Sequence, residues 1–204
     1  MSNKVISGTA NAPYFSQQDI IGMYHLRGKV FKERLNWDVQ TQNGLEIDEF
    51  DQLNPIYLLS KNYRNDVEGC LRLIPTSGPY MLEKVFPQLL RGETIPKNKD
   101  IWEMSRCAVE LSSSHPTVQG NMNDVTVGII RNAYEFAVLH DIEQYVAVVS
   151  VAFERLLKQL GLPMRRFGDG RAVRLGKVLS TAVWIDVNDE YRLAVRDQGF
   201  AIAA

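Results

Sequence analysis

The chain has few of the residues that build disulfide frameworks, metal centres or histidine-dependent catalysis. Its 204 residues include two cysteines and three histidines. Cys70 and Cys107 lack the CxxC and Cys/His spacings of zinc and redox sites, and the histidines stand apart from one another. We therefore expect two buried free thiols, no metal and no cofactor.

Long hydrophobic runs and a large net charge are also absent. No segment approaches the roughly 18 apolar residues that span a bilayer, and the start of the chain leads into no apolar run of signal-peptide length. The net charge is −1, so the whole molecule does not have the charge of a polyanion binder. We expect a cytoplasmic protein that is one domain over residues 1–204, with neither nucleic acid nor membrane as a partner.

The common nucleotide-binding and hydrolase signatures are missing as well. The chain contains no GxSxG elbow, no P-loop and no GxGxxG turn. What it does contain is arginines and carboxylates inside apolar segments. Such residues are suited to a zwitterionic ligand, with a carboxylate as base and an arginine as anion holder.

Hydrophobic periodicity predicts alternating helices and strands. Helices are expected at Ser16 to about Arg34, Leu82–Phe86, Asp124–His140, Ser150–Leu160 and Asn188–Arg196, and strands at Pro55–Leu59, Val67–Ile74, Ile101–Val109, Ile142–Val149, Met164–Phe167 and Val178–Val187. Residues 111–121 are expected to form a loop. This mixed order predicts an α/β fold, a three-layer α/β/α sandwich with a mixed central sheet.

The strand at 101–109 carries Glu103, Ser105 and Arg106 in an otherwise apolar run. A buried charge is costly unless it is paired or used, so the segment is either a site or an edge strand that faces water. Strict alternation places Glu103 and Ser105 on one face and Arg106 on the other. If Arg106 shares the site, a β-bulge must redirect it.

Three further segments carry unusual charge. Arg27 interrupts the apolar stripe of the first helix and must reach water or a buried anion. Glu46, Asp48, Glu49 and Asp51 stand within six residues; they lack calcium-loop spacing, so a solvated loop is expected. Between Arg155 and Lys177 there are seven basic residues and one acid, a local charge of +6, which indicates either an acidic or phosphate-bearing partner or a face matched by nearby acids.

Taken together, these polar residues resemble one family. Arg27, Phe31 and Trp37, then Asp48 and Asp51, then Arg72, Phe86 and the run Glu103-Met104-Ser105-Arg106 are similar to the acyl-homoserine-lactone synthases of the LuxI type. The neighbouring stretches "LRGKVFKERLNWDV", "GCLRLIPTSGPYML" and "IWEMSRCAV" agree, and the resemblance runs from about Met23 to Val187.

The resemblance implies a fold similar to the GNAT acyltransferases and a defined reaction. S-adenosyl-L-methionine would supply the homoserine part, and an acyl carrier protein or acyl-CoA the acyl chain. The products would be methylthioadenosine and an N-acyl-L-homoserine lactone, a quorum-sensing signal. The N-terminal lobe, about residues 1–53, would close over S-adenosylmethionine.

The resemblance also implies residue roles. Arg27, Phe31, Trp37, Asp48, Asp51 and Arg72 would bind S-adenosylmethionine, with the aspartates on its cationic groups and the aromatic rings as a wall. An Arg27–Asp48 pair that only supports the lobe is the competing interpretation. Glu103 would be the base that frees the attacking amine, with Ser105 and Arg106 beside it, and backbone N–H groups near a bulge would hold the thioester oxygen. The alternative for Arg106 is that it pairs with the acidic lobe and only organises it.

An apolar channel is expected for the acyl chain. Its candidate lining residues are Met81, Phe86, Met104, Val125, Ile129, Ala147, Val149 and Phe153, although most of them would also suit an ordinary core. Ala147 stands where family members that make 3-oxo signals often carry threonine, which favours a chain without a 3-oxo group. Cys107 replaces a phenylalanine of many relatives and would widen the pocket.

An acidic carrier protein would dock on Arg155, Lys158, Arg165 and Arg166 by charge, and the phosphates of acyl-CoA would fit the same residues. The alternative function is a GNAT-type N-acyltransferase that acts on another amine, but the usual Q/R-x-x-G-x-G/A turn is not apparent before the second long helix. A non-catalytic binding protein is the third possibility, against which the intact Glu103, Arg106, Arg27 and Asp48 argue.

Overall fold

A computed structural model describes residues 4–110, 117–118 and 122–196. Its main sheet has the strand order β1-β4-β5-β6-β9-β12-β10, and β11 also pairs with β12. The strands are β1 Lys4–Gly8, β4 Ile56–Lys61, β5 Val67–Pro75, β6 Ile101–Val109, β9 Gln144–Ser150, β10 Met164–Arg166, β11 Val173–Leu175 and β12 Val178–Asp186. Within this sheet β6 and β9 are parallel and the other pairs are antiparallel, so the mixed sheet is confirmed.

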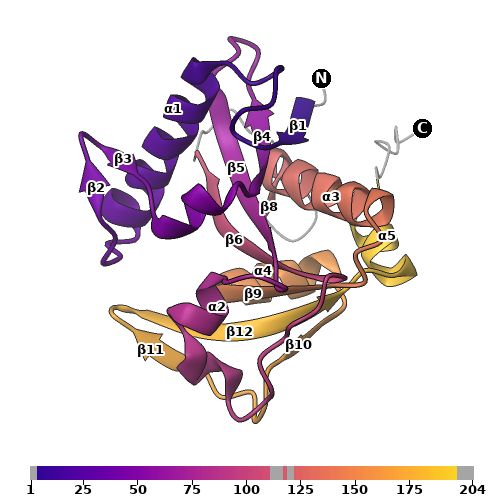
Figure 1. Cartoon of the computed structure of the whole chain (residues 1–204). Coiled ribbons are helices and arrows are strands. Elements are labelled where there is room, and N and C mark those ends of the chain that lie inside the picture. Colours follow the sequence, from indigo (N-terminus) through magenta and orange to yellow (C-terminus); the bar gives the residue numbers. More distant parts are fainter. Residues whose placement is uncertain (1–3, 111–116, 119–121, 197–204) are drawn as a thin grey trace.

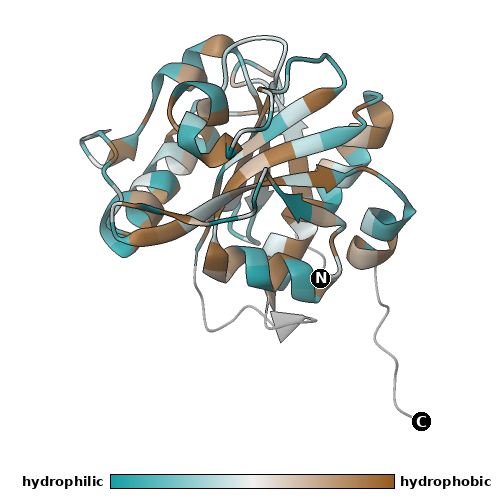
Figure 2. Cartoon of the chain, turned by 90° about the horizontal axis from the view of Figure 1, so that it is seen from below, coloured by the Kyte–Doolittle hydropathy of each residue, from teal (hydrophilic) through white to brown (hydrophobic). Residues whose placement is uncertain are grey.

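Helices cover both faces of the sheet (Figure 1). Helices α3 (Asp124–Leu139), α4 (Val151–Leu160) and α5 (Asp189–Val195) contribute to one core, whereas α1 (Gln17–Arg27) and α2 (Met81–Lys84) contribute to the cores on the other face. Figure 2 shows hydrophilic and hydrophobic residues in alternation along the helices, as expected for elements with one buried side. The predicted three-layer α/β/α arrangement is confirmed.

Most predicted helices and strands are present, with small shifts at their ends. Ser16 caps α1 in a capping box with Asp19, and Gly161 ends α4 with a φ of 95°. The first helix is not α-helical to its end, because Gly28–Arg34 is a π-helix, η1. Of the expected loop at 111–121, residues 111–116 and 119–121 lie outside the described residues, while Thr117–Val118 forms β7, which pairs with β8 (Met122–Asn123).

The acidic segment is structured rather than a solvated loop. It contains a hairpin of β2 (Thr41–Gln42) and β3 (Leu45–Glu46) and a 3₁₀ helix, η2 (Glu49–Leu53). Gly28 allows this hairpin to approach α1, because a Cβ at Gly28 would collide with the carbonyl oxygen of Gly44. The hairpin therefore brings Glu46 next to the end of α1. A second 3₁₀ helix, η3 (Pro87–Leu90), follows α2.

Strand β6 contains the bulge that the sequence left open. In its pairing with β5, Cys70 lies opposite Ala108 and Arg72 opposite Ser105, so two residues of β6 face Leu71 alone. Arg106, one of those two residues, has a φ of 54°, in the left-handed region. On the other side, pairing with β9 ends at Met104 and Ala147, and Figure 1 shows the two halves of the sheet at a large angle to each other.

Among the described residues, every helix is too short or too polar to span a bilayer.

Candidate active site

A cavity of about 1280 Å³ opens along the bulged part of β6. Its wall combines the π-helix η1, the acidic segment, α2, the strands β6 and β9, and parts of α3 and α4. The sequence-predicted residues that line it are Phe31, Trp37, Asp48, Met81, Phe86, Glu103, Met104, Ser105, Arg106, Ala147, Val149 and Phe153. The structure therefore brings most of the predicted catalytic, substrate-binding and acyl-pocket residues to one space.

Three arginines and three carboxylates form a charge-balanced network beside this cavity. Arg27 donates to both oxygens of Asp51 at 2.8 and 2.9 Å and also to Glu46. Arg72 donates to Asp48 at 3.0 Å and to Asp51 at 2.8 Å. These fork-shaped contacts are the strong, geometrically specific kind of charged hydrogen bond.

Arg106 completes the network from the bulge. Its guanidinium lies 2.9 Å from an oxygen of Glu46 and 2.8 Å from one of Asp48. The left-handed backbone at Arg106 turns this side chain toward the lobe that carries the acids. The bulge that the sequence left open is present, and Arg106 reaches the same cavity as Glu103.

Burial and pairing shift the acid–base behaviour of the network. Although burial alone would raise the pKa of Asp51, the neighbouring Arg27 and Arg72 hold that pKa well below its usual range. The pKa of Arg27 is raised by Asp51 and Glu46 against the effect of burial. Tyr57 donates to Asp51 at 2.7 Å, and burial raises the pKa of this phenol. Asp51 is therefore ionised and Arg27 charged at neutral pH.

Glu103 lies in a different environment. Its side chain is fully buried, and its two oxygens accept hydrogen bonds from the backbone N–H groups of Met81 and Leu82 at 3.0 and 2.7 Å. Burial raises the pKa of Glu103 to about 7, against the lowering effect of these bonds and of Arg72 and Arg106. A carboxyl that titrates near neutral pH is suited to accept and release a proton.

Three of the expected substrate-binding residues do not line the cavity. Arg27, Asp51 and Arg72 lie behind its wall, with side-chain exposures of 0%, 2% and 0%. Their hydrogen-bonding groups are directed to one another rather than to open space. The Arg27–Asp48 pair of the competing interpretation is a weak contact, with Arg27 Nη2 3.8 Å from Asp48 Oδ2. Arg27 pairs mainly with Asp51 and Glu46.

Met81 is expected to line only the acyl pocket, but it also contacts the arginine network. Its sulfur lies 3.0 Å from a nitrogen of Arg72 and 3.3 Å from one of Arg106. Thioethers are weak acceptors, so Met81 packs against the two guanidiniums as well as against the cavity.

Val125 and Ile129 are corrections to the predicted acyl pocket. Both are fully buried but absent from the cavity wall, because they lean over Gly69 of β5 and fill the space where a Cβ would stand. Their neighbours Thr126 and Ile130 on α3 line the cavity instead. Helical spacing rotates these positions away from Gly69.

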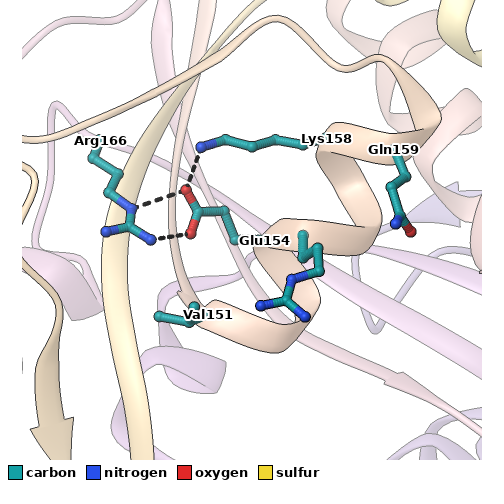
Figure 3. A pocket seen from close by; sticks show the side chains of 6 residues that line it. Val151, Glu154, Lys158, Gln159 and Arg166 are labelled. Carbon is teal, nitrogen blue, oxygen red and sulfur yellow. Dashed lines mark hydrogen bonds and ion pairs between the residues drawn. The ribbon is translucent and has the colours of Figure 1, made fainter.

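The basic run is largely matched by acids. Figure 3 shows Lys158 and Arg166 on the buried carboxylate of Glu154, at 2.7 and 2.6 Å. Arg165 pairs with Glu93 at 2.8 Å. Arg155 has no ion-pair partner in the described part of the chain, and it lines a pocket of about 380 Å³ with Lys158 and Arg166. The pocket is thus lined by three basic side chains, Arg155, Lys158 and Arg166, and by the carboxylate of Glu154.

Sequence reasoning missed several residues of the site. In the sequence Glu46 is only one acid of a cluster, yet in the structure it joins Arg27 to Arg106. The far part of the cavity wall was also missed; it includes Thr126, Ile130, Leu157, Leu162, Ile185 and Tyr191. Their only sequence signal is apolar periodicity, which does not separate cavity wall from core. Cys70 is buried and Cys107, which lines the cavity, is half-buried; both are free.

In the described residues, no group of three or more His, Cys, Asp or Glu side chains could hold a metal ion.

The fold is similar to those of solved acyltransferases. A putative N-acetyltransferase from Lactobacillus plantarum covers 92% of this chain and 100% of its own, with a TM-score of 0.60 at 13% identity. The acyl-homoserine lactone synthase BjaI, solved with SAM and isopentyl-CoA, covers 94% of this chain and 87% of its own, with a TM-score of 0.82 at 22% identity. The fold is therefore similar to that of GNAT acyltransferases, as expected.

Closer relatives define the family. The AHL synthase LasI has a TM-score of 0.82 at 32% identity and covers 95% of both chains. The acyl-homoserine-lactone synthase of Vibrio anguillarum is 37% identical over 179 residues, which is 88% of this chain and 92% of the relative. The autoinducer synthase profile matches residues 12–195. This chain belongs to the autoinducer synthase family of enzymes, and the resemblance to acyl-homoserine-lactone synthases is confirmed.

Proposed function

We propose that this enzyme joins the homoserine part of S-adenosyl-L-methionine to an acyl group carried as a thioester. The amine of S-adenosylmethionine attacks the thioester carbonyl, which forms an amide and releases a thiol. The carboxylate then attacks the carbon that bears the sulfonium, closing the lactone and releasing methylthioadenosine. The donor is an acylated acyl carrier protein or acyl-CoA, and the enzyme works in the cytoplasm.

The observation that carries this proposal is the position of Glu103. A buried carboxyl with a pKa of about 7 lines the cavity at the bulged strand. Ionised, it removes a proton from the substrate ammonium, directly or through a water, and leaves a neutral amine that can attack. At the bulge β6 no longer pairs with β9, and the N–H groups there stabilise the oxyanion that forms on the thioester carbonyl oxygen.

The N-terminal lobe, about residues 1–53, supplies the surface for S-adenosylmethionine. Asp48 lines the cavity with its side chain 16% exposed, so it is available to a cationic group. Trp37 stacks on Phe31 with ring centroids 5.1 Å apart, and its buried Nε1 has no hydrogen-bond partner among the described residues. The two rings offer an aromatic wall and one free donor, while Arg27, Asp51 and Arg72 contact Asp48 from behind.

The acyl chain occupies the apolar end of the same cavity, between α3, α4 and β9. Ala147 provides no hydrogen-bonding side chain there, which favours an acyl chain without a 3-oxo group. Met104, Val149 and Phe153 form the walls. Outside the cavity, Arg155, Lys158, Arg165 and Arg166 form the docking surface for an acidic carrier protein.

Expression of this chain in a bacterium that makes no such signals tests the function. Mass spectrometry of the medium should detect an N-acyl-L-homoserine lactone, and its mass gives chain length and oxidation state together. A matched strain that expresses Glu103→Gln should yield little or none. Properly folded wild-type protein that makes no lactone when S-adenosylmethionine and acyl donors are supplied would contradict the proposal.

A further inference from the structure

Arg34 is a cavity-lining arginine to which neither the sequence nor the network assigns a role. It is the last residue of η1, and its Nη1 donates to the carbonyl oxygen of Val109 at 3.1 Å. Both residues line the large cavity. The side chain therefore crosses from the N-terminal lobe to the end of β6.

The direction of the Val109 carbonyl places Arg34 in the gap between β6 and β9. The N–H of Glu110 donates to Glu68 on β5 at 2.8 Å. In a trans peptide unit the C=O points opposite to the N–H, so the Val109 carbonyl faces the other edge of β6. That edge is the one from which β9 has separated, because pairing ends at Met104 and Ala147.

Arg34 also differs from the other arginines of the site in its ion pairing. No carboxylate in the described part of the chain pairs with it, whereas Arg27, Arg72 and Arg106 are each committed to Glu46, Asp48 or Asp51. Partial burial lowers the pKa of the Arg34 guanidinium, and no neighbouring acid opposes that effect. Arg34 as a residue is exposed, so its guanidinium is only partly covered and, with one neutral partner, keeps donors for an anion.

We propose that Arg34 binds the phosphate at the end of the donor's phosphopantetheine arm, the group that acyl carrier protein and acyl-CoA share. This rests on the proposed function, because the thioester must lie at the bulge. At ~3.3 Å per residue, Val109 lies at most about 10 Å beyond Arg106 of the bulge along β6, so the arm bends or runs past Val109 to bring its phosphate to Arg34. Arginine binds phosphate oxygens through its planar fork of N–H groups.

A pair of donors that differ only in the phosphate tests this assignment. Arg34→Gln should raise the KM for an acyl-4′-phosphopantetheine by about 10- to 100-fold, and leave the KM for the matching acyl-pantetheine unchanged. Lys29→Gln is the matched control, because Lys29 lies in the same π-helix, is 61% exposed and is absent from the cavity wall. It should behave as the wild type with both donors.

The alternative results separate the explanations. An equal rise with both donors would show that Arg34 only supports β6 through Val109, and a rise in the KM for S-adenosylmethionine alone would assign it to that substrate's carboxylate; either overturns the proposal. Repeating the comparison with acyl carrier protein and acyl-CoA identifies which phosphate source is used. If the wild type acylates no S-adenosylmethionine from any donor, it is the proposed function that fails.

Discussion

Glu103 and Arg106 reach one cavity from strand positions that regular alternation would place on opposite faces. The left-handed backbone at Arg106, with a φ of 54°, and the two-against-one bulge opposite Leu71 make this possible. The same bulge ends the pairing of β6 with β9. One backbone irregularity thus positions a charged side chain and opens the space for a substrate.

Glu103→Gln should reduce turnover by about 10²- to 10⁴-fold, because an amide does not serve as a general base. Steady-state lactone formation measures the loss, and circular dichroism verifies the fold. Glu83→Gln is the matched control, since Glu83 lies on α2 but pairs with Lys97 away from the cavity. Near-normal turnover in Glu103→Gln would remove Glu103 as the base.

The pH dependence of kcat/KM should follow the same carboxyl. Because burial raises its pKa to about 7, Glu103 is protonated and inactive at lower pH. We expect kcat/KM to rise with pH through about 7 and then level off. An acid limb centred near pH 4 to 5, the ordinary range of a glutamate, would show that the working base is not this buried group.

Glu46→Gln should destabilise the fold, because Glu46 is 1% exposed and pairs with both Arg27 and Arg106. Removing one partner from a buried charge network costs about 3–5 kcal/mol. Urea unfolding measures the change, with the exposed neighbour Glu49→Gln as a control expected within about 0.5 kcal/mol of the wild type. Equal unfolding midpoints for the two variants would refute the structural role of Glu46.

Ile130→Phe should shift the product toward shorter acyl chains. Ile130 lines the apolar part of the cavity from α3, so a larger side chain removes space, at a stability cost of about 1–3 kcal/mol. The lactones made from a mixture of donors report the shift by mass. Val138→Phe, on the same helix at a 57% exposed position, should leave the distribution unchanged, and an unchanged distribution in Ile130→Phe would place the acyl chain elsewhere.

Arg155→Glu should weaken the use of acyl carrier protein, because Arg155 is the cation of its pocket that no described acid neutralises. We expect a KM for the acidic carrier that rises with the substitution and with salt, since screening shortens the range of charge attraction to about 10 Å at 0.1 M. Acyl-pantetheine, which has no carrier surface, should be unaffected by the substitution. Salt-independent KM values for the carrier would argue against electrostatic docking.

The fold was largely predictable from the sequence because it depends on local patterns. Ser16 with Asp19, Ser150 and Gly161 marked helix ends by their own chemistry. By contrast, β1 and the hairpin β2–β3 are short and depend on partners far along the chain. Such pairing leaves little trace in local hydrophobicity.

The site was predictable in its members but not in its connections. The resemblance named Arg27, Asp48, Asp51 and Arg72, yet which arginine meets which carboxylate depends on how the acidic segment folds over β5 and β6. The direction of Arg106 depends on its register with Cys70 and Arg72. A bulge of one extra residue arises from the pairing of two strands. It therefore cannot be predicted from the sequence of either strand alone.

Because the oxygens of Glu103 accept hydrogen bonds from the first two N–H groups of α2, a proton on this carboxyl is expected to weaken the anchor of that helix. A protonated carboxyl accepts hydrogen bonds less strongly than a carboxylate. Met81, one of the two residues held, also contacts Arg72 and Arg106 through its sulfur. Protonation of Glu103 is therefore expected to weaken the anchor of α2 beside the guanidiniums of Arg72 and Arg106, and deprotonation to restore it.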